Sequence, residues 1–270
     1  MVKETRTHNA ERSQIAKISS KALEKLQSSE KTTNEGEGKK VSESEVQKAF
    51  SYSADQARKE YSDHAKGGVH YYKRRGRCAE LFVHKMNYNS IDTNKTLRKN
   101  FPVVDIIHGK RFYSIKVRGH SDRGVLVRNY AHDLRVALGT VSPKNPGRHN
   151  AVELAAKELL ECREHNQQVW KKIERQLPTE MRKMTDIREM SKTIIDNIYL
   201  LIPSDHVQAT REYLRQVARR HPENYGLPGN LAGQELERAI DQLCHRIQPI
   251  HKEIYLSNFT TTFRRRTGEA

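Results

Sequence analysis

The spacing of apolar residues predicts a chain whose strands lie in the middle and whose ends are helical. Helical periodicity is present over residues 10–27, 43–65, 77–87, 122–138, 151–175, 205–220 and 234–248. Apolar, β-branched and aromatic runs of strand length cover Phe101–Ile107, Arg111–Arg118 and Ile198–Ile202. The order of these segments predicts an α/β core with helical N- and C-terminal additions.

Turn and linker signals divide the predicted elements into regions. Ser28–Val41 is charged and rich in Gly, Ser and Lys, which is typical of a flexible linker. Ser42 and Glu45 form a capping-box pattern at the start of the next helix. Gly226–Gly233 interrupts the pattern again before the last helix. We therefore predict a helical N-terminal arm over 1–70, a core over 71–225 and a helical C-terminal extension over 226–270.

Two local patterns predict how the strands pair. The first two strand segments are separated only by His108-Gly109-Lys110, a glycine-containing turn that favours an antiparallel hairpin. The third segment, Ile198–Ile202, leads through Pro203 directly into a helix, which is typical of a parallel crossover. We therefore expect a mixed central sheet flanked by helices.

Charge narrows the choice of partners. The chain has 49 Lys+Arg and 33 Asp+Glu, a formal net charge of +16. Such a surplus favours a polyanionic partner, with nucleic acid first and an anionic membrane surface second. No apolar run is long enough to cross a bilayer, so we expect no membrane insertion. The three cysteines are far apart and lack metal-ligand spacing, which suits a reducing cytoplasm.

The predicted hairpin carries a candidate catalytic pair. Because side chains alternate along strands, Asp105 on the first strand shares a face with Phe112, Ser114 and Lys116 on the second. Asp105 is then opposite Phe112 or Ser114, depending on the turn. An ordinary cross-strand ion pair would explain the same pattern. The apolar residues around the pair indicate a covered hairpin, in which a charge pair is costly unless a metal or substrate uses it.

A second carboxylate comes from the helix upstream. Glu80 lies at the edge of that helix's apolar stripe, about 60° from Val83. It could reach the rim of the sheet, or it could be a solvated helix charge beside Arg77 and His84. Two carboxylates and a lysine suit phosphodiester hydrolysis assisted by Mg²⁺, a cation that prefers oxygen ligands. Ser114 could hold a water molecule beside the ion, although packing of a small strand residue against Asp105 or Phe112 is the interpretation that the sequence favours.

The segment after Lys116 has the character of a DNA-reading element. Arg118-Gly119-His120-Ser121-Asp122-Arg123 leads into the helix at 122–138. An Arg and an Asp at a helix N-terminus can enter the major groove, where Arg can donate to guanine O6 and N7 and Asp can accept from cytosine N4. Capping of the helix by Asp122, with Arg123 as its surface partner, explains these residues equally well.

Taken together, Pro102-Val103-Val104-Asp105, Ser114-Ile115-Lys116 and the following His120-Ser121-Asp122-Arg123 resemble a known nuclease motif. The pattern is similar to that of the CCGG family of type II restriction endonucleases, within the PD-(D/E)xK superfamily. The resemblance implies that Asp105 is a metal ligand and Lys116 the catalytic lysine. It also implies that Asp122 and Arg123 contact the C·G pairs, with His120 or Arg118 in the place of the family's first Arg.

The chain departs from this family at the second acid. The family has a Glu about a dozen residues after the lysine, where this chain has Asn129 and Tyr130. Asp133 is the nearest carboxylate in that helix, and Glu80 is the acid we favour. The motif match covers residues 102–123, and the implied fold would extend over roughly 71–222.

The sequence thus predicts a Mg²⁺-dependent type II restriction endonuclease of the bacterial cytoplasm. Its partner would be double-stranded DNA carrying a CCGG-containing palindrome. Symmetric cutting of a palindrome favours a homodimer or a higher homo-oligomer, in which the N-terminal arm could take part. Two alternatives stay open: another PD-(D/E)xK nuclease acting in repair or junction resolution, and a non-catalytic basic DNA-binding protein.

Overall fold

The computed structural model describes residues 41–61, 69–119, 122–141 and 149–263. Contacts divide the chain into two units, Met1–Ser42 and Glu43–Ala270, and all the elements described below belong to the second. The predicted helix at 10–27, the predicted linker except for its last residue, and the basic run Arg264-Arg265-Arg266 lie outside the described residues.

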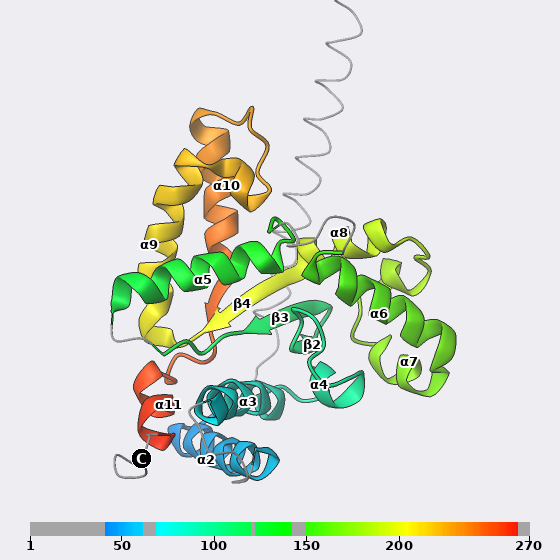
Figure 1. The fold of residues 1–270 in the computed structure, drawn as a ribbon, viewed down its shortest axis with the longest axis vertical. Coiled ribbons are helices and arrows are strands. Elements are labelled where there is room, and N and C mark those ends of the chain that lie inside the picture. Colours follow the sequence, from blue (N-terminus) through cyan, green and yellow to red (C-terminus); the bar gives the residue numbers. More distant parts are fainter. Residues whose placement is uncertain (1–40, 62–68, 120–121, 142–148, 264–270) are drawn as a thin grey trace, which may run out of the picture. The chain divides into compact units, whose positions relative to one another are not determined.

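A five-stranded mixed sheet forms the centre of the second unit (Figure 1). Its strands lie side by side in chain order: β1 (Ile91–Asp92), β2 (Ile106–His108), β3 (Arg111–Ile115), β4 (Ile198–Ile202) and β5 (Ile247–Pro249). The β1–β2 and β2–β3 pairs are antiparallel, whereas the β3–β4 and β4–β5 pairs are parallel. The prediction of a mixed sheet is therefore confirmed, and β3 is its central strand.

Helices surround this sheet. They are α2 (Glu43–Glu60), α3 (Val69–Met86), α4 (Thr93–Thr96), α5 (Arg123–Ala137), α6 (Ala151–His165), α7 (Gln167–Ile173), α8 (Ile187–Asn197), α9 (Ser204–Arg220), α10 (Gly233–His245) and α11 (Leu256–Thr262), with short 3₁₀ turns at Thr179–Arg182 and Pro222–Tyr225. Among the helices that the structure describes, none is long and apolar enough to cross a membrane.

The sheet separates two hydrophobic cores because its strands alternate their side chains between two covered faces. On one face, Phe112 and Leu200 pack with apolar residues of α5, α6, α8, α9 and α10. On the other face, Ile115 and Leu201 pack with α2, α3 and α11. The two groups of helices lie on opposite sides of the sheet in Figure 1.

The hairpin has the predicted turn but a shorter first strand. His108 pairs with Arg111, so Gly109 and Lys110 form a two-residue turn, and both have positive φ as such turns require. The prediction of a strand from Phe101 is wrong, because β2 begins only at Ile106. Before it, Val104 N donates to Pro102 O at 2.6 Å around Val103, whose φ is +55°. This tight turn interrupts the strand conformation.

Several predicted helices have different bounds in the structure. The pattern over 151–175 is two helices, α6 and α7, because Asn166 ends the first and caps the second. The pattern over 234–248 ends at His245, and the residues after it form β5. The helix predicted at 77–87 begins earlier, at Val69. Elements without a sequence prediction are β1, α4, α8, β5 and α11.

Described residues of the predicted N-terminal arm and of the predicted C-terminal extension both pack on the sheet or on its covering helices. Val46 and Phe50 of α2 share one hydrophobic core with Phe82 of α3, so α2 is part of the same compact unit as the sheet. At the other end, β5 is a full member of the sheet beside β4. Within the described residues, α2 and β5 therefore pack directly on the centre of the second unit.

Candidate active site

Asp105 lies immediately before β2, where the hairpin ladder ends. Its backbone N donates to Tyr113 O at 2.8 Å. Its Oδ2 accepts from Ile115 N at 2.6 Å and from Lys116 Nζ at 3.2 Å. The carboxylate thus takes the place of a backbone carbonyl as the partner of Ile115 N–H, which fixes the side chain against the opposite strand.

Lys116 follows β3 directly and continues its pairing with β4. Its backbone N donates to Leu201 O at 2.9 Å, so the main chain beneath the side chain is anchored in the centre of the sheet. Burial would lower the pKa of Lys116, but the carboxylates of Asp105, Asp133 and Glu80 outweigh it and raise that pKa above its ordinary value. The Lys116 side chain is therefore cationic near neutral pH.

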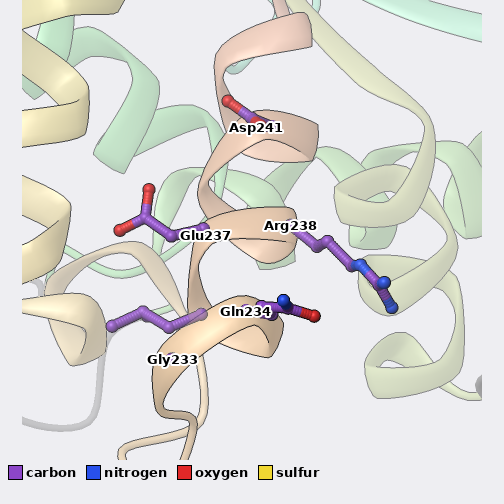
Figure 2. Close-up of a pocket in the computed structure, with 6 residues that line it drawn as sticks. Gly233, Gln234, Glu237, Arg238 and Asp241 are labelled. Atoms are coloured by element: carbon purple, nitrogen blue, oxygen red, sulfur yellow. The ribbon is translucent and has the colours of Figure 1, made fainter.

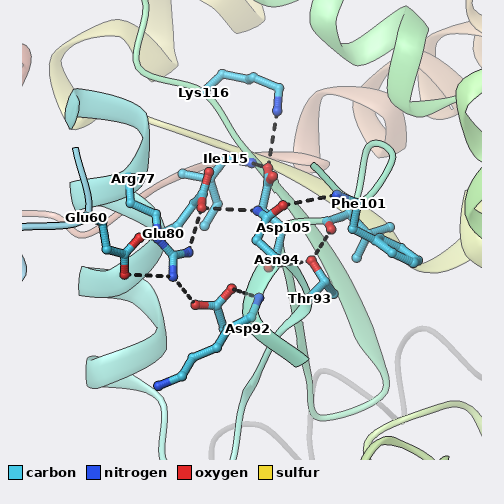
Figure 3. Close-up of polar contacts among 12 residues, drawn as sticks. Glu60, Arg77, Glu80, Asp92, Thr93, Asn94, Phe101, Asp105, Ile115 and Lys116 are labelled. Carbon is cyan, nitrogen blue, oxygen red and sulfur yellow. Dashed lines mark hydrogen bonds and ion pairs between the residues drawn. The ribbon is translucent and has the colours of Figure 1, made fainter. Parts of the chain in front are cut away.

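Glu80 projects from α3 towards the same end of the hairpin (Figure 3). Its Oε2 accepts from Arg77 Nη1 at 2.9 Å and from Asn94 Nδ2 at 3.2 Å. Burial and the charge of Asp105 raise the pKa of Glu80 to about 7, although Arg77 acts in the opposite direction. Glu80 is thus a largely buried carboxylate close to Asp105, and not the solvated helix charge that the sequence left open.

The two carboxylates share a further property. The protein's hydrogen bonds to each one converge on a single oxygen, Oε2 of Glu80 and Oδ2 of Asp105. Within the described residues, Glu80 Oε1 and Asp105 Oδ1 accept no hydrogen bond. Neither atom is among the fully buried polar atoms without a partner, so both keep some access to solvent. Each carboxylate is therefore held by one oxygen and offers the other, an arrangement that suits a hard cation.

Arg77 stands at the centre of an ion cluster that is buried except for Glu60, whose side chain is 43% exposed. It donates to Glu60 on α2 (2.7 Å), to Glu80 (2.9 Å) and to Asp92 (2.7 Å), which caps α4. The Arg77 side chain is only 6% exposed and that of Asp92 only 2%. We call Arg77, Glu60, Glu80 and Asp92 the Arg77 cluster; Figure 3 shows how it adjoins Asp105.

The local charge differs in sign from that of the whole chain. The Arg77 cluster and the Asp105–Lys116 pair together hold four carboxylates and two cations, a formal charge of −2. The chain as a whole carries +16. A divalent cation would neutralise this centre, while the basic remainder of the protein would attract a polyanion.

Ser114 lies on β3 one residue beyond the register that pairs Ile106 with Tyr113, which places it opposite Asp105. It is 1% exposed, and its Oγ has no hydrogen-bond partner in the structure. A buried hydroxyl without a partner is costly and is commonly satisfied by a bound water. Packing alone, the other interpretation of Ser114, leaves this hydroxyl unexplained.

The predicted DNA-contacting residues occupy the start of α5. Asp122 is the N-cap of α5 and accepts from Gly124 N at 2.7 Å, so its capping role is confirmed. Arg123 is the first residue of the helix and is exposed. His120 and Ser121 lie outside the described residues. A role for any of these residues in reading bases stays a prediction.

Arg118 and Asp133, the other acid considered from the sequence, bond to each other. Arg118 Nε donates to Asp133 Oδ2 at 2.9 Å, and Nη2 donates to Oδ1. Both oxygens of Asp133 are thus occupied, in contrast to those of Glu80 and Asp105. Asp133 contributes negative potential at Lys116, but Glu80 is the carboxylate with an oxygen to offer.

Two further observations bear on a ligand. In the described part of the chain, no group of three or more His, Cys, Asp or Glu residues is placed to hold a metal ion. A hollow of about 660 Å³ lies on α10, lined by Gly233, Gln234, Leu236, Glu237, Arg238 and Asp241 (Figure 2). None of these residues belongs to the Glu80–Asp105–Lys116 centre, and the hollow has no partner-free buried polar group that would indicate its own ligand.

Comparisons with protein-family models, with curated proteins and with solved structures found no match to this chain. The interpretation of the centre therefore rests on its geometry and on the sequence motif.

Sequence reasoning proposed Glu80, Asp105 and Lys116, which the structure brings to one end of the hairpin (Figure 3), but it did not find the residues that contact Glu80. Arg77 entered only as a neighbour of Glu80, and Asp92 and Asn94 were not singled out. Arg77 and Glu80 are three apart on α3, on the face that turns towards the sheet. A charged pair on an otherwise apolar helix face is the signal that could have indicated the cluster.

Proposed function

We propose that this protein is a Mg²⁺-dependent DNA endonuclease with a PD-(D/E)xK-like centre formed by Glu80, Asp105 and Lys116. One observation carries the proposal: Glu80 and Asp105 are 25 positions apart in the sequence yet lie together, each with one oxygen fixed and one available. Mg²⁺ binds through one or two carboxylates together with waters and substrate phosphate oxygens, so two carboxylates are enough to hold it.

The protein groups have distinct roles in this proposal. Glu80 Oε1 and Asp105 Oδ1 would hold the ion, which supplies positive charge to the phosphate and lowers the pKa of water. Lys116 Nζ, kept cationic by the surrounding carboxylates, donates hydrogen bonds that orient the attacking water and stabilise charge on the phosphate. Ser114 Oγ, buried without a partner, would bond a water beside the centre.

Within this class we propose a type II restriction endonuclease that cuts a CCGG-containing palindrome as a homodimer. The motif from Asp105 to Arg123 supports this finer assignment. The position of Arg123, exposed at the N-terminus of α5 a few residues after Lys116, also suits contact with DNA. Asp122 would have to serve both as helix cap and as acceptor for a cytosine amino group.

The test is cleavage of plasmid DNA with Mg²⁺, with the ends mapped by sequencing. EDTA and Lys116→Ala should abolish cutting, while DNA affinity stays close to that of the wild type. Lys252→Ala is the matched control, because this lysine is 81% exposed and lies outside the centre. Discrete fragments ending within CCGG-containing sites would support the restriction enzyme. Random or structure-dependent nicks would support another nuclease of this superfamily.

The net charge of +16 also supports a non-catalytic DNA-binding protein. That function predicts tight, steeply salt-dependent binding and no cleavage with any divalent metal. Lys116→Ala would then change binding only by one lost charge, and the Asp105–Lys116 pair would be a structural salt bridge.

A further inference from the structure

The two candidate metal ligands differ in what holds them in place. Asp105 is fixed by the backbone of the hairpin, through Ile115 N, as well as by Lys116. Glu80 has a longer side chain on a helix, and no backbone group binds it. Its orientation therefore depends on the two side chains that donate to Oε2, Arg77 and Asn94.

We propose that Arg77 and Asn94 are positioning residues that clamp Glu80 Oε2 and so direct Oε1 to the metal ion. This inference rests on the function proposed above. Both donors bond the same oxygen, at 2.9 and 3.2 Å, which leaves one defined orientation for the carboxylate. Groups that orient a metal ligand in this way tune affinity without touching the ion.

Arg77 is suited to this role because its other donors are also occupied. Nε and Nη2 bond Glu60 at 2.7 and 3.3 Å, and Nη2 bonds Asp92 at 2.7 Å. The planar guanidinium is thus held between α2 and the residue that caps α4, and only Nη1 faces Glu80. A lysine at this position would keep the charge but lose the fork that binds three carboxylates at once.

Asn94 is oriented from its other side. Its Oδ1 accepts from Phe101 N at 3.0 Å, so the amide must present its Nδ2 donor to Glu80. Phe101 begins the irregular segment that leads to Asp105. The clamp therefore connects the position of Glu80 to the segment that carries the second metal ligand.

The inference is tested by measuring Mn²⁺ affinity by electron paramagnetic resonance, alongside the Mg²⁺ dependence of cleavage. The variants are Arg77→Lys and Asn94→Ala, and Asp105→Asn defines the signal that belongs to this centre. Arg219→Lys is the matched control, because Arg219 makes a comparable bidentate pair with Glu237 on the exposed surface. Urea unfolding and DNA affinity are measured for every variant.

We expect Arg77→Lys and Asn94→Ala to weaken Mn²⁺ binding by roughly 10- to 100-fold and to raise the Mg²⁺ requirement for cleavage in parallel. DNA affinity should be unchanged, and the control should behave as wild type. If Arg77→Lys does not fold, the Mn²⁺ affinity of Asn94→Ala tests the clamp, because this variant leaves the ion pairs of the Arg77 cluster intact.

Two results would overturn the clamp. In the first, the wild type binds Mn²⁺ and cuts DNA, and the folded variants bind Mn²⁺ with unchanged affinity. This result would reject the clamp but not the proposed nuclease function. A wild-type protein that neither binds Mn²⁺ at the Asp105-dependent site nor cuts DNA would reject the proposed function, and the clamp with it.

Discussion

Ionisation of Glu80 should govern part of the pH dependence of stability when no metal is present. Burial and Asp105 raise the pKa of this carboxyl from 4.5 to about 7 in the folded protein. A group whose pKa is raised on folding stabilises the fold fully below its unfolded-state pKa, and that contribution is lost as the pH rises through the folded-state pKa. The loss should therefore fall between pH 4.5 and about 7.

The magnitude follows from the size of the shift. At about 1.4 kcal/mol per pKa unit, the shift corresponds to a loss of about 3 kcal/mol across that interval. Glu80→Gln removes the ionisation but keeps an oxygen that can accept from Arg77 and Asn94. Relative to the wild type, the variant should therefore gain up to about 3 kcal/mol of unfolding free energy as the pH rises from 4.5 to about 7.

Urea unfolding in EDTA, at several pH values between these limits, measures the effect. The informative quantity is the difference between wild type and Glu80→Gln, because titrating groups far from Glu80 cancel from it, leaving Glu80 and the groups whose charge it influences, such as Asp105 and Lys116. Glu235→Gln is the control, since this carboxylate is exposed on the first turn of α10. A difference between wild type and Glu80→Gln that stays constant with pH would show that Glu80 is not destabilised by burial beside Asp105.

Three further predictions concern Gly119, the N-cap of α5 and the proposed homodimer. A Cβ on Gly119 would overlap the guanidinium at the end of the Arg75 side chain, which must move, so Gly119→Ala should cost about 1 kcal/mol in urea unfolding. An equal cost in an Arg75→Ala background would contradict this contact. Asp122→Ala should lose about 1 kcal/mol of stability through the missing cap, and Asp122→Asn should retain it. Stability equal to wild type in Asp122→Ala would exclude the capping role. Sedimentation should detect dimers with DNA, and monomers alone, both free and bound, would reject the homodimer.

The elements that were predicted well are those that local signals define. The helix that became α5 has a capping residue at Asp122 and ends before Gly139, and β4 coincides with the apolar run Ile198–Ile202. The turn at Gly109-Lys110 set the register, and with it the relation of Asp105 to Lys116. In each case, residues next to one another in sequence carry the whole signal.

The parts that could not be predicted depend on contacts between distant residues. Phe101–Val104 has strand-like composition, yet a tight turn at Val103 interrupts it. The residues of β5 continue a helical pattern, and only pairing with β4 makes them a strand. The Arg77 cluster joins Glu60 to Asp92 across the packed α2–α3 pair, and no local pattern shows that these carboxylates share one arginine.

The order of the strands has a consequence for synthesis of the chain. The hairpin of β2 and β3 closes over a two-residue turn, so Asp105 and Lys116 can approach each other as soon as this segment leaves the ribosome. The pairing of β3 with β4, in contrast, joins residues that are far apart in the sequence, such as Phe112 and Ile198. The strand that pairs with β4 on its other side, β5, comes later still in the chain. Contacts of such long range form slowly and need nearly the whole chain. An incomplete chain would therefore contain all three residues of the proposed centre but would lack the sheet that anchors Lys116, so that the proposed DNA cleavage would await completion of the protein.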